Sequence, residues 1–306
     1  MQPFHYHDGQ REIQREANSV PAADKLSTWI GPVATYTNEA DLIVLACADA
    51  DTLQIAALSG PSPLATARDA GGEITVSLPG VLTSLLPVDR QWGGIVINPA
   101  TARRSRVAGR PTLNGLLVDI PCAVAFTNCR KYMTPTSSSG ASTHAGPTAH
   151  EVLAQDDPWV AEIIARGETA FLVTATPDGL ADVSHRGGQP GFLRLDAASR
   201  RVTWTEYLGD GMFVSTGNIR REPRFALIVL DVMCSTMIPA MRCVSMGRRA
   251  TPTCGAIVMS GWTRCCRLRS RFPFREAWRR RYSAWRASCS SVSRARASSD
   301  ARASPR

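Results

Sequence analysis

Ala170-Phe-Leu-Val-Thr-Ala-Thr-Pro-Asp-Gly179 is an apolar run of strand length that ends in a turn, and it resembles Leu42-Ile-Val-Leu-Ala-Cys-Ala-Asp-Ala-Asp51. A short apolar run bounded by Asp, Pro and Gly is typical of a buried strand that leads into a hairpin. The two stretches lie in different halves of the chain. They therefore indicate that one strand-rich unit occurs twice.

The order of elements around these stretches also repeats. Short helices are predicted at 81–87 (VLTSLLP) and 211–223 (GMFVSTGNIRREP), and each precedes a strand, at 93–100 (GGIVINPA) and 225–232 (FALIVLDV). Identity between the halves is weak, so the repeat rests on the order of elements. We expect a mainly β protein with a few helices, built as a duplicated antiparallel β-barrel.

Composition divides the chain into five parts. We expect an N-terminal arm and helix over 1–40, a first half-barrel over 41–133, a flexible linker of small polar residues over 134–148, a helix plus the second half-barrel over 149–250, and a basic tail over 251–306. Asp157 before Pro158 predicts where the helix begins, because proline is favoured at the first helical position.

The net charge of +9 comes from the last quarter of the chain. From Met233 onward there are 16 Arg, no Lys, one Asp and one Glu, whereas the preceding 232 residues carry 19 basic and 24 acidic side chains. Such Arg-rich, Lys-free composition is typical of a GC-rich gene read out of frame. We expect the tail to be disordered or out of frame, and a genuine element that binds nucleic acid or anionic lipid is the alternative.

The rest of the chain favours a cytoplasmic protein without a membrane partner. The N-terminal MQPFHYHDGQ lacks the apolar core of a signal peptide, and no apolar run approaches the ~20 residues that span a bilayer. Cys47, Cys122 and Cys129 do not have metal-ligand spacing, so we expect free thiols and no metal site.

The stretch Asp182-Val-Ser-His-Arg-Gly-Gly-Gln-Pro-Gly-Phe192 carries the candidate site residues. Ser184 and His185 offer hydrogen bonds, and the guanidinium of Arg186 suits a phosphate. Gly187 and Gly188 let a ligand approach the backbone closely. The alternatives are a solvated His185 in a turn, and an Arg186 that pairs with Asp182 or Glu206.

Several motifs together resemble the flavin-binding split-barrel family of pyridoxamine 5′-phosphate oxidase-like proteins, in particular its uncharacterised oxidase-related subgroup. The matching stretches are FHYHDGQREIQREA, VINPATARRSRVAGRP, FTNCRKYM, ADVSHRGGQPGFLRL and FVSTGNIRREPRFALIVLD. DVSHRGG followed by PGF and later by GN is the most specific part. The resemblance covers residues 4 to 232, and the tail does not match.

The resemblance implies a six-stranded split barrel that binds FMN at the interface of a homodimer. Arg186 would contact the phosphate or ribityl chain, Ser184 and His185 would border the same ligand, and Gly187 and Gly188 would give it room. Asn218 would hydrogen-bond the isoalloxazine rim, with a helix cap as its alternative role. The flavin would carry the chemistry, so no protein residue is assigned as catalytic.

The implied function is transfer of hydride or electrons between FMN and a small substrate or redox partner. The alternative is a non-catalytic module that binds a flavin, a deazaflavin or haem. Two weaker candidate segments remain. The run Arg103–Arg106 could meet a phosphate, but we expect a solvated strand edge, because charge on an edge strand blocks aggregation. Asn128–Tyr132 could reach the site of a partner subunit or act as a connector.

Overall fold

The structure is a computed structural model, and it describes residues 3–60, 62–133, 135, 149–153, 158–196, 201–230, 241–244, 249–253, 256–260 and 265–269. The chain divides into two units, 1–269 and 270–306, and the second lies outside the described residues. The predicted linker over 134–148 also lies outside them, apart from residue 135.

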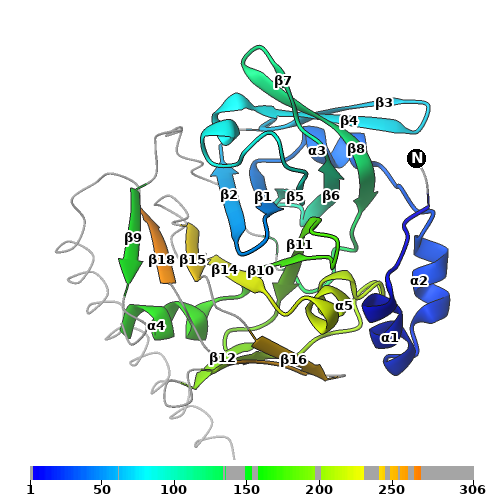
Figure 1. Cartoon of the computed structure of the whole chain (residues 1–306). Coiled ribbons are helices and arrows are strands. Elements are labelled where there is room, and N and C mark those ends of the chain that lie inside the picture. The colour runs from blue at the N-terminus through cyan, green and yellow to red at the C-terminus, as the bar shows by residue number, and fades with distance from the viewer. Residues whose placement is uncertain are drawn as a thin grey trace, which may run out of the picture. The chain divides into compact units, whose positions relative to one another are not determined.

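The first half of the chain forms one antiparallel sheet in the order β2-β1-β5-β6-β8-β4-β3, with β7 paired to β8 (Figure 1). Its strands are β1 (Leu42–Ala48), β2 (Leu53–Ser59), β3 (Thr66–Ala70), β4 (Glu73–Pro79), β5 (Trp92–Asn98), β6 (Arg103–Gly109), β7 (Thr112–Asn114) and β8 (Leu117–Thr127). The strand β1 is buried along its whole length, as its apolar run predicts.

The second half forms two antiparallel sheets, in the orders β11-β10-β14-β15-β18-β9 and β12-β13-β17-β16. Their strands are β9 (Ala149–Leu153), β10 (Thr169–Ala175), β11 (Ala181–Gly187), β12 (Leu193–Asp196), β13 (Arg201–Trp204), β14 (Phe225–Leu230), β15 (Met241–Val244), β16 (Arg249–Thr253), β17 (Ala256–Ser260) and β18 (Cys265–Arg269). The prediction of a mainly β protein is confirmed.

Strand pairing follows one scheme in both halves. The strand β1 pairs with β2 and β5, and β10 pairs in the same way with β11 and β14. In the first half, β8 pairs with both β4 and β6. In the second half, two strands take the place of β8: β17 pairs with β13, and β18 pairs with β15. The repeat that was expected from the order of elements therefore extends to the pairing of the strands.

The region expected to be a disordered or out-of-frame tail begins with strands. The strands β16, β17 and β18 lie between residues 249 and 269, and β17 pairs with β13 of the second half. The backbones of β17 and β18 extend the hydrogen bonding of β13 and β15, and the expectation of a disordered or out-of-frame tail over 251–306 stays a prediction. Residues 270–306 lie outside the described residues.

Short helices flank the sheets. They are α1 (Asp8–Glu16), α2 (Val20–Leu26), α3 (Val33–Asn38), the 3₁₀ helix η1 (Gly80–Ser84), α4 (Pro158–Arg166) and α5 (Val214–Arg221). The helix α4 begins at Pro158 as predicted, and η1 and α5 are the two expected short helices. None of the helices in the described ranges is long and apolar enough to cross a membrane.

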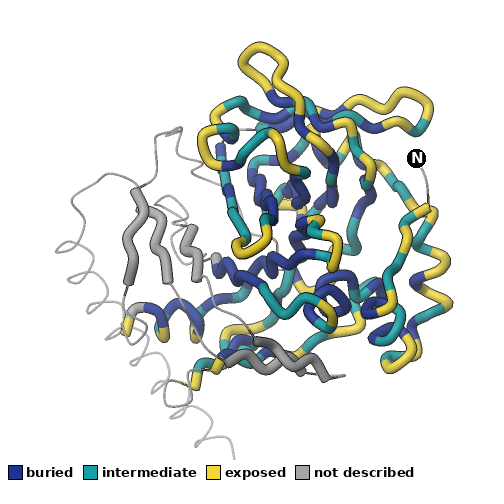
Figure 2. The backbone as a smooth tube through the Cα atoms, viewed as in Figure 1, coloured by how far each residue is buried: buried dark blue, intermediate teal, exposed yellow. Residues whose placement is uncertain are grey.

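Each half has its own apolar cluster, and a third cluster joins the two halves. Ala46 and Ile95 from the first half pack with Phe171, Val183 and Ile228 from the second. The central strands are almost entirely buried, as Figure 2 shows. The backbones also approach closely, because a Cβ atom added at Gly93 of β5 would lie 1.9 Å from the carbonyl oxygen of Ala181 in β11.

We expect Gly93→Ala to lower the free energy of unfolding by about 1–3 kcal/mol. The added Cβ would collide with the backbone carbonyl group of Ala181, so only a shift of a strand can relieve the overlap. Urea denaturation measures the change. The control is Gly60→Ala, whose added Cβ meets only the end of the Leu64 side chain, at 3.3 Å. Equal stability of the two variants would contradict the close approach of β5 to β11.

Candidate functional site

One pocket gathers residues from both halves, with a volume of about 90 Å³. Side chains from β6 and β11, the segment after β8, and the loop that leads into α5 form its wall. The lining residues are Arg104, Arg106, Asn128, Cys129, Lys131, Tyr132, Ser184, His185, Arg186, Gly187, Phe192, Thr205, Glu206, Tyr207, Leu208, Gly209, Asp210, Met212, Phe213 and Val214.

Arg104 is a buried cation in this wall. Its Nη1 donates to the carbonyl oxygen of Ala102 (3.3 Å) and to the sulfur of Met133 (3.4 Å), and its Nη2 donates to the carbonyl oxygen of Lys131 (3.2 Å). Among the described residues these partners include no carboxylate. Burial lowers the pKa of Arg104 to about 10, so the guanidinium is still protonated at neutral pH.

Arg106 is held by a network of buried polar groups that joins the two halves. Its Nε lies 3.1 Å from Oδ1 of Asp182, and its Nη2 donates to Ser184 Oγ. The hydroxyls of Ser184 and Ser215 donate to Oδ2 of Asp182 at 3.1 and 2.9 Å. The carboxylate of Asp182 therefore neutralises Arg106 and ties β6 to β11 and α5.

Arg186 forms the ion pair that was considered as its alternative role. Its Nε and Nη2 donate to the two carboxylate oxygens of Glu206, at 2.9 and 2.6 Å, and its Nη1 donates to the carbonyl oxygen of His185. Glu206 also accepts hydrogen bonds from Trp204 and Thr216. Arg186 lines the pocket with its charge neutralised by Glu206, and its assignment to a phosphate stays a prediction.

His185 is not a solvated turn residue. It lies in β11, its ring makes an edge contact with Phe171 (5.9 Å between centroids), and its buried Nε2 has no hydrogen-bond partner among the described residues. Burial, followed by the charges of Arg104 and Arg186, lowers the pKa of His185 well below its ordinary value. The imidazole is therefore neutral at physiological pH.

The two glycines make room for the protein itself. A Cβ at Gly187 would lie 2.0 Å from the carbonyl oxygen of Tyr132, and a Cβ at Gly188 would lie 2.8 Å from Cβ of Phe192. Of these two glycines, Gly187 lines the pocket and Gly188 does not. The expectation that both give room to a ligand is corrected, because chain segments fill the space beside them.

Asn218 does not line the pocket, and it is fully buried inside α5. Its Oδ1 accepts hydrogen bonds from His7 Nε2 (2.8 Å) and Gln10 Nε2 (2.9 Å), and its Nδ2 donates to Thr174 Oγ1 (3.0 Å). Asn218 therefore joins α1 to α5 and β10. The alternative role as a helix cap is corrected, because Asn218 lies inside α5 and Glu222 caps that helix. Its expected contact with a flavin rim stays a prediction, although its amide is used within the core.

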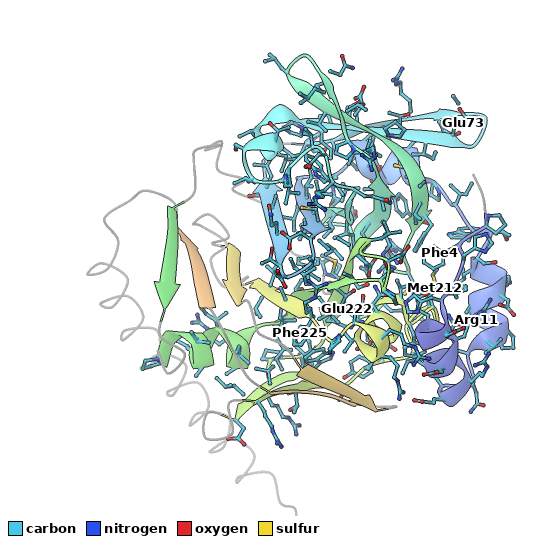
Figure 3. The ribbon with its side chains drawn as sticks, viewed as in Figure 1. Phe4, Arg11, Glu73, Met212, Glu222 and Phe225 are labelled. Atoms are coloured by element: carbon cyan, nitrogen blue, oxygen red, sulfur yellow. The ribbon has the colours of Figure 1, made fainter. Side chains whose placement is uncertain are left out.

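The N-terminal segment reaches the wall of the pocket through an apolar cluster. Phe4 and Met212, both labelled in Figure 3, belong to this cluster together with Phe126 and Val214. Gln14 donates a hydrogen bond to the carbonyl oxygen of Met212 (2.8 Å). The arm therefore supports the loop that carries Met212 and Val214 into the pocket wall.

Several of the lining residues were only weak candidates in the sequence analysis. Arg104 and Arg106 were expected on a solvated strand edge, but β6 lies between β5 and β8, and both side chains are buried. The segment Asn128–Tyr132 lines the pocket at four of its five positions. Alternate residues of a strand share one face, so the sequence could have predicted that Arg104 and Arg106 lie on the same face of β6.

No family model, curated protein or solved structure matches the chain in the comparisons with known proteins. Among the described residues there is also no group of His, Cys, Asp or Glu that could hold a metal ion.

We expect Asn218→Ala to lower the free energy of unfolding by about 1–3 kcal/mol, because the half-buried donor of His7 and the buried donor of Gln10 lose their acceptor. Limited proteolysis should cleave residues 1–40 faster in this variant. The control is Asn114→Ala, which removes an exposed hydrogen bond to Asp119. If proteolysis of the two variants proceeds equally, Asn218 does not hold the N-terminal arm.

We expect Asp182→Leu to cost about 3–5 kcal/mol of stability, because it leaves the charge of Arg106 buried and unpaired. Combining it with Arg106→Leu should restore part of the loss. Thermal and urea unfolding of the two single variants and the double variant give the coupling energy. The exposed pair Arg11–Asp24 is the control, with an expected change of at most about 1 kcal/mol for Asp24→Ala.

Proposed function

We propose that this protein is an FMN-binding oxidoreductase-like protein of the split-barrel type, cytoplasmic and homodimeric, that transfers hydride or electrons to or from a small substrate or redox partner. The observation that carries the proposal is the buried guanidinium of Arg104 in the pocket wall, which lacks a carboxylate partner among the described residues. A buried charge without a counter-charge is costly, and an anionic ligand would offset that cost.

The charges of the pocket fit the phosphate of a flavin nucleotide. Arg186 is neutralised by Glu206, and Arg106 is neutralised by Asp182. The remaining charged residues of the lining are Arg104, Lys131 and Asp210. Two cations against one carboxylate leave an excess of positive charge. Arg104 and Lys131 are therefore the residues that we propose to hold the phosphate, in place of Arg186.

The size of the pocket fits only part of a flavin nucleotide. Its volume of about 90 Å³ is well below the roughly 300–1,000 Å³ of pockets that enclose a whole small-molecule ligand. The ring system would thus lie outside the charged pocket. A second subunit that covers the ring agrees with the homodimer that the sequence resemblance implies.

When bound, FMN supplies the hydride or electron chemistry, and the chain supplies binding and orientation. Arg104 and Lys131 would neutralise the phosphate. The neutral ring of His185 would offer its Nε2, which has no hydrogen-bond partner among the described residues, as a donor or acceptor beside the ligand. The network around Asp182 would keep the wall rigid, so that these groups need not reorganise when the ligand binds.

A second candidate is a non-catalytic haem-binding module, and His185 favours it. A neutral imidazole with a free Nε2 is a common ligand of haem iron. Against it, the pocket wall carries several cationic side chains, and its volume of about 90 Å³ is too small to enclose a macrocycle. A deazaflavin that carries a phosphate would use the same contacts as FMN.

The absorption spectrum of the purified protein incubated with FMN, with haem or with neither tests the proposal. Bound FMN should shift the flavin bands, whereas a Soret band would support the haem module. We expect Arg104→Met to weaken FMN binding about 10- to 100-fold, the loss of a charge-assisted contact. Fluorescence titration gives the dissociation constants.

Arg103→Met is the matched control, because Arg103 lies next to Arg104 in β6 but pairs with Glu39 outside the pocket. It should leave FMN affinity unchanged within about twofold. Equal affinity of the Arg104 and Arg103 variants would exclude Arg104 as the phosphate contact. A wild-type protein that binds no FMN would overturn the proposed function.

A further inference from the structure

Two tyrosines form a flat aromatic stack in the pocket wall. The rings of Tyr132 and Tyr207 are nearly parallel, with 4.5 Å between centroids and 11° between planes. Both residues line the pocket, and they are 44% and 43% exposed, whereas Arg104, Arg106 and Ser184 are each 6% exposed or less. The stack is therefore the solvent-facing part of a wall whose inner part is charged.

The backbone holds Tyr132 in a conformation that a tyrosine rarely adopts. Its φ is +62°, in the left-handed region, which costs of order 1–3 kcal/mol for a residue other than glycine. Arg104 binds the segment on both sides of it, through the carbonyl oxygen of Lys131 and the sulfur of Met133. The carbonyl group of Tyr132 packs against Gly187, where a side chain would collide with it.

Tyr207 is positioned by the hydrogen-bonded residue that precedes it. It follows Glu206, whose carboxylate is fixed by Arg186, Trp204 and Thr216. The rings of the pair therefore come from two segments that are each anchored by buried polar contacts. Strained backbone that is held in this way concentrates at ligand sites, and here it serves to present an exposed aromatic surface.

We propose that the Tyr132–Tyr207 stack is the ligand-stacking platform of this pocket, so that the site selects planar aromatic phosphomonoesters. The proposal rests on the proposed function in using the same pocket for the phosphate. The pocket is too small for a ring system, and the aromatic stack is the exposed surface next to it. A phosphate held by Arg104 and Lys131 would leave an attached flat ring against the face of a tyrosine.

Stacking and phosphate binding make separate contributions, which allows them to be measured separately. An aromatic side chain that stacks on a planar ring contributes about 1–3 kcal/mol, which corresponds to roughly 5- to 150-fold in affinity. Inorganic phosphate lacks the ring and should not respond to the tyrosines. A ligand with both parts should respond to the tyrosines and to Arg104.

The experiment measures dissociation constants for FMN and for 1-naphthyl phosphate, a flat phosphomonoester that is not a flavin, with inorganic phosphate as competitor. We expect Tyr207→Leu to lower the affinity for both aromatic ligands at least about tenfold. The affinity for inorganic phosphate, measured by competition, should stay unchanged. Tyr207→Phe keeps the ring and should retain wild-type affinity within about threefold. Tyr36→Leu, whose ring contacts Arg103 outside the pocket, is the control.

The outcomes separate this proposal from the proposed function. If FMN binds and Tyr207→Leu leaves both aromatic ligands unaffected, the platform is overturned and the flavin function stands. If wild-type protein binds 1-naphthyl phosphate in a Tyr207-dependent way but not FMN, the platform stands and the flavin function is overturned. If neither aromatic ligand binds to the wild-type protein, both are overturned.

Discussion

The buried ion pair between Arg106 and Asp182 is the interaction on which the rest of the pocket depends. Arg106 lies in the first half, and Asp182 lies in the second. Two serine hydroxyls complete the hydrogen bonding of the carboxylate. A buried carboxylate that is hydrogen-bonded in this way beside the charge of Arg106 fixes the position of β11 relative to β6, whereas apolar packing alone would tolerate small shifts between them.

The strands were predictable because their signal is local. The length and the ends of β1 and β10 follow from their apolar runs alone. Pro158 likewise marks the first residue of α4 without any distant partner. The repeat of the halves was also readable, since it needs only the order of such elements. The short strands β16–β18 were not, because their backbone partners lie in β13 and β15 and their composition resembles a solvated tail.

The site was only partly predictable, because the role of a charged residue depends on distant partners. Ser184, His185, Arg186 and Gly187 were placed in the pocket by their motif, whereas Arg104 was expected on a solvated edge. Composition does not say whether an arginine run lies at the edge or in the middle of a sheet, and pairing on both sides decided it here. Likewise, Arg186 is neutralised by Glu206, which lies 20 positions further along the chain.

The attachment of α1 has a consequence for the order in which the protein is made. The acceptor of His7 and Gln10 in Asn218 follows 211 and 208 residues later, so it leaves the ribosome well after them. At roughly 5–20 residues per second, α1 waits on the order of 10–40 s for this partner. During this interval Ile13 and the inward face of α1 lack the helix that covers them, so this face is accessible to chaperones until α5 is made.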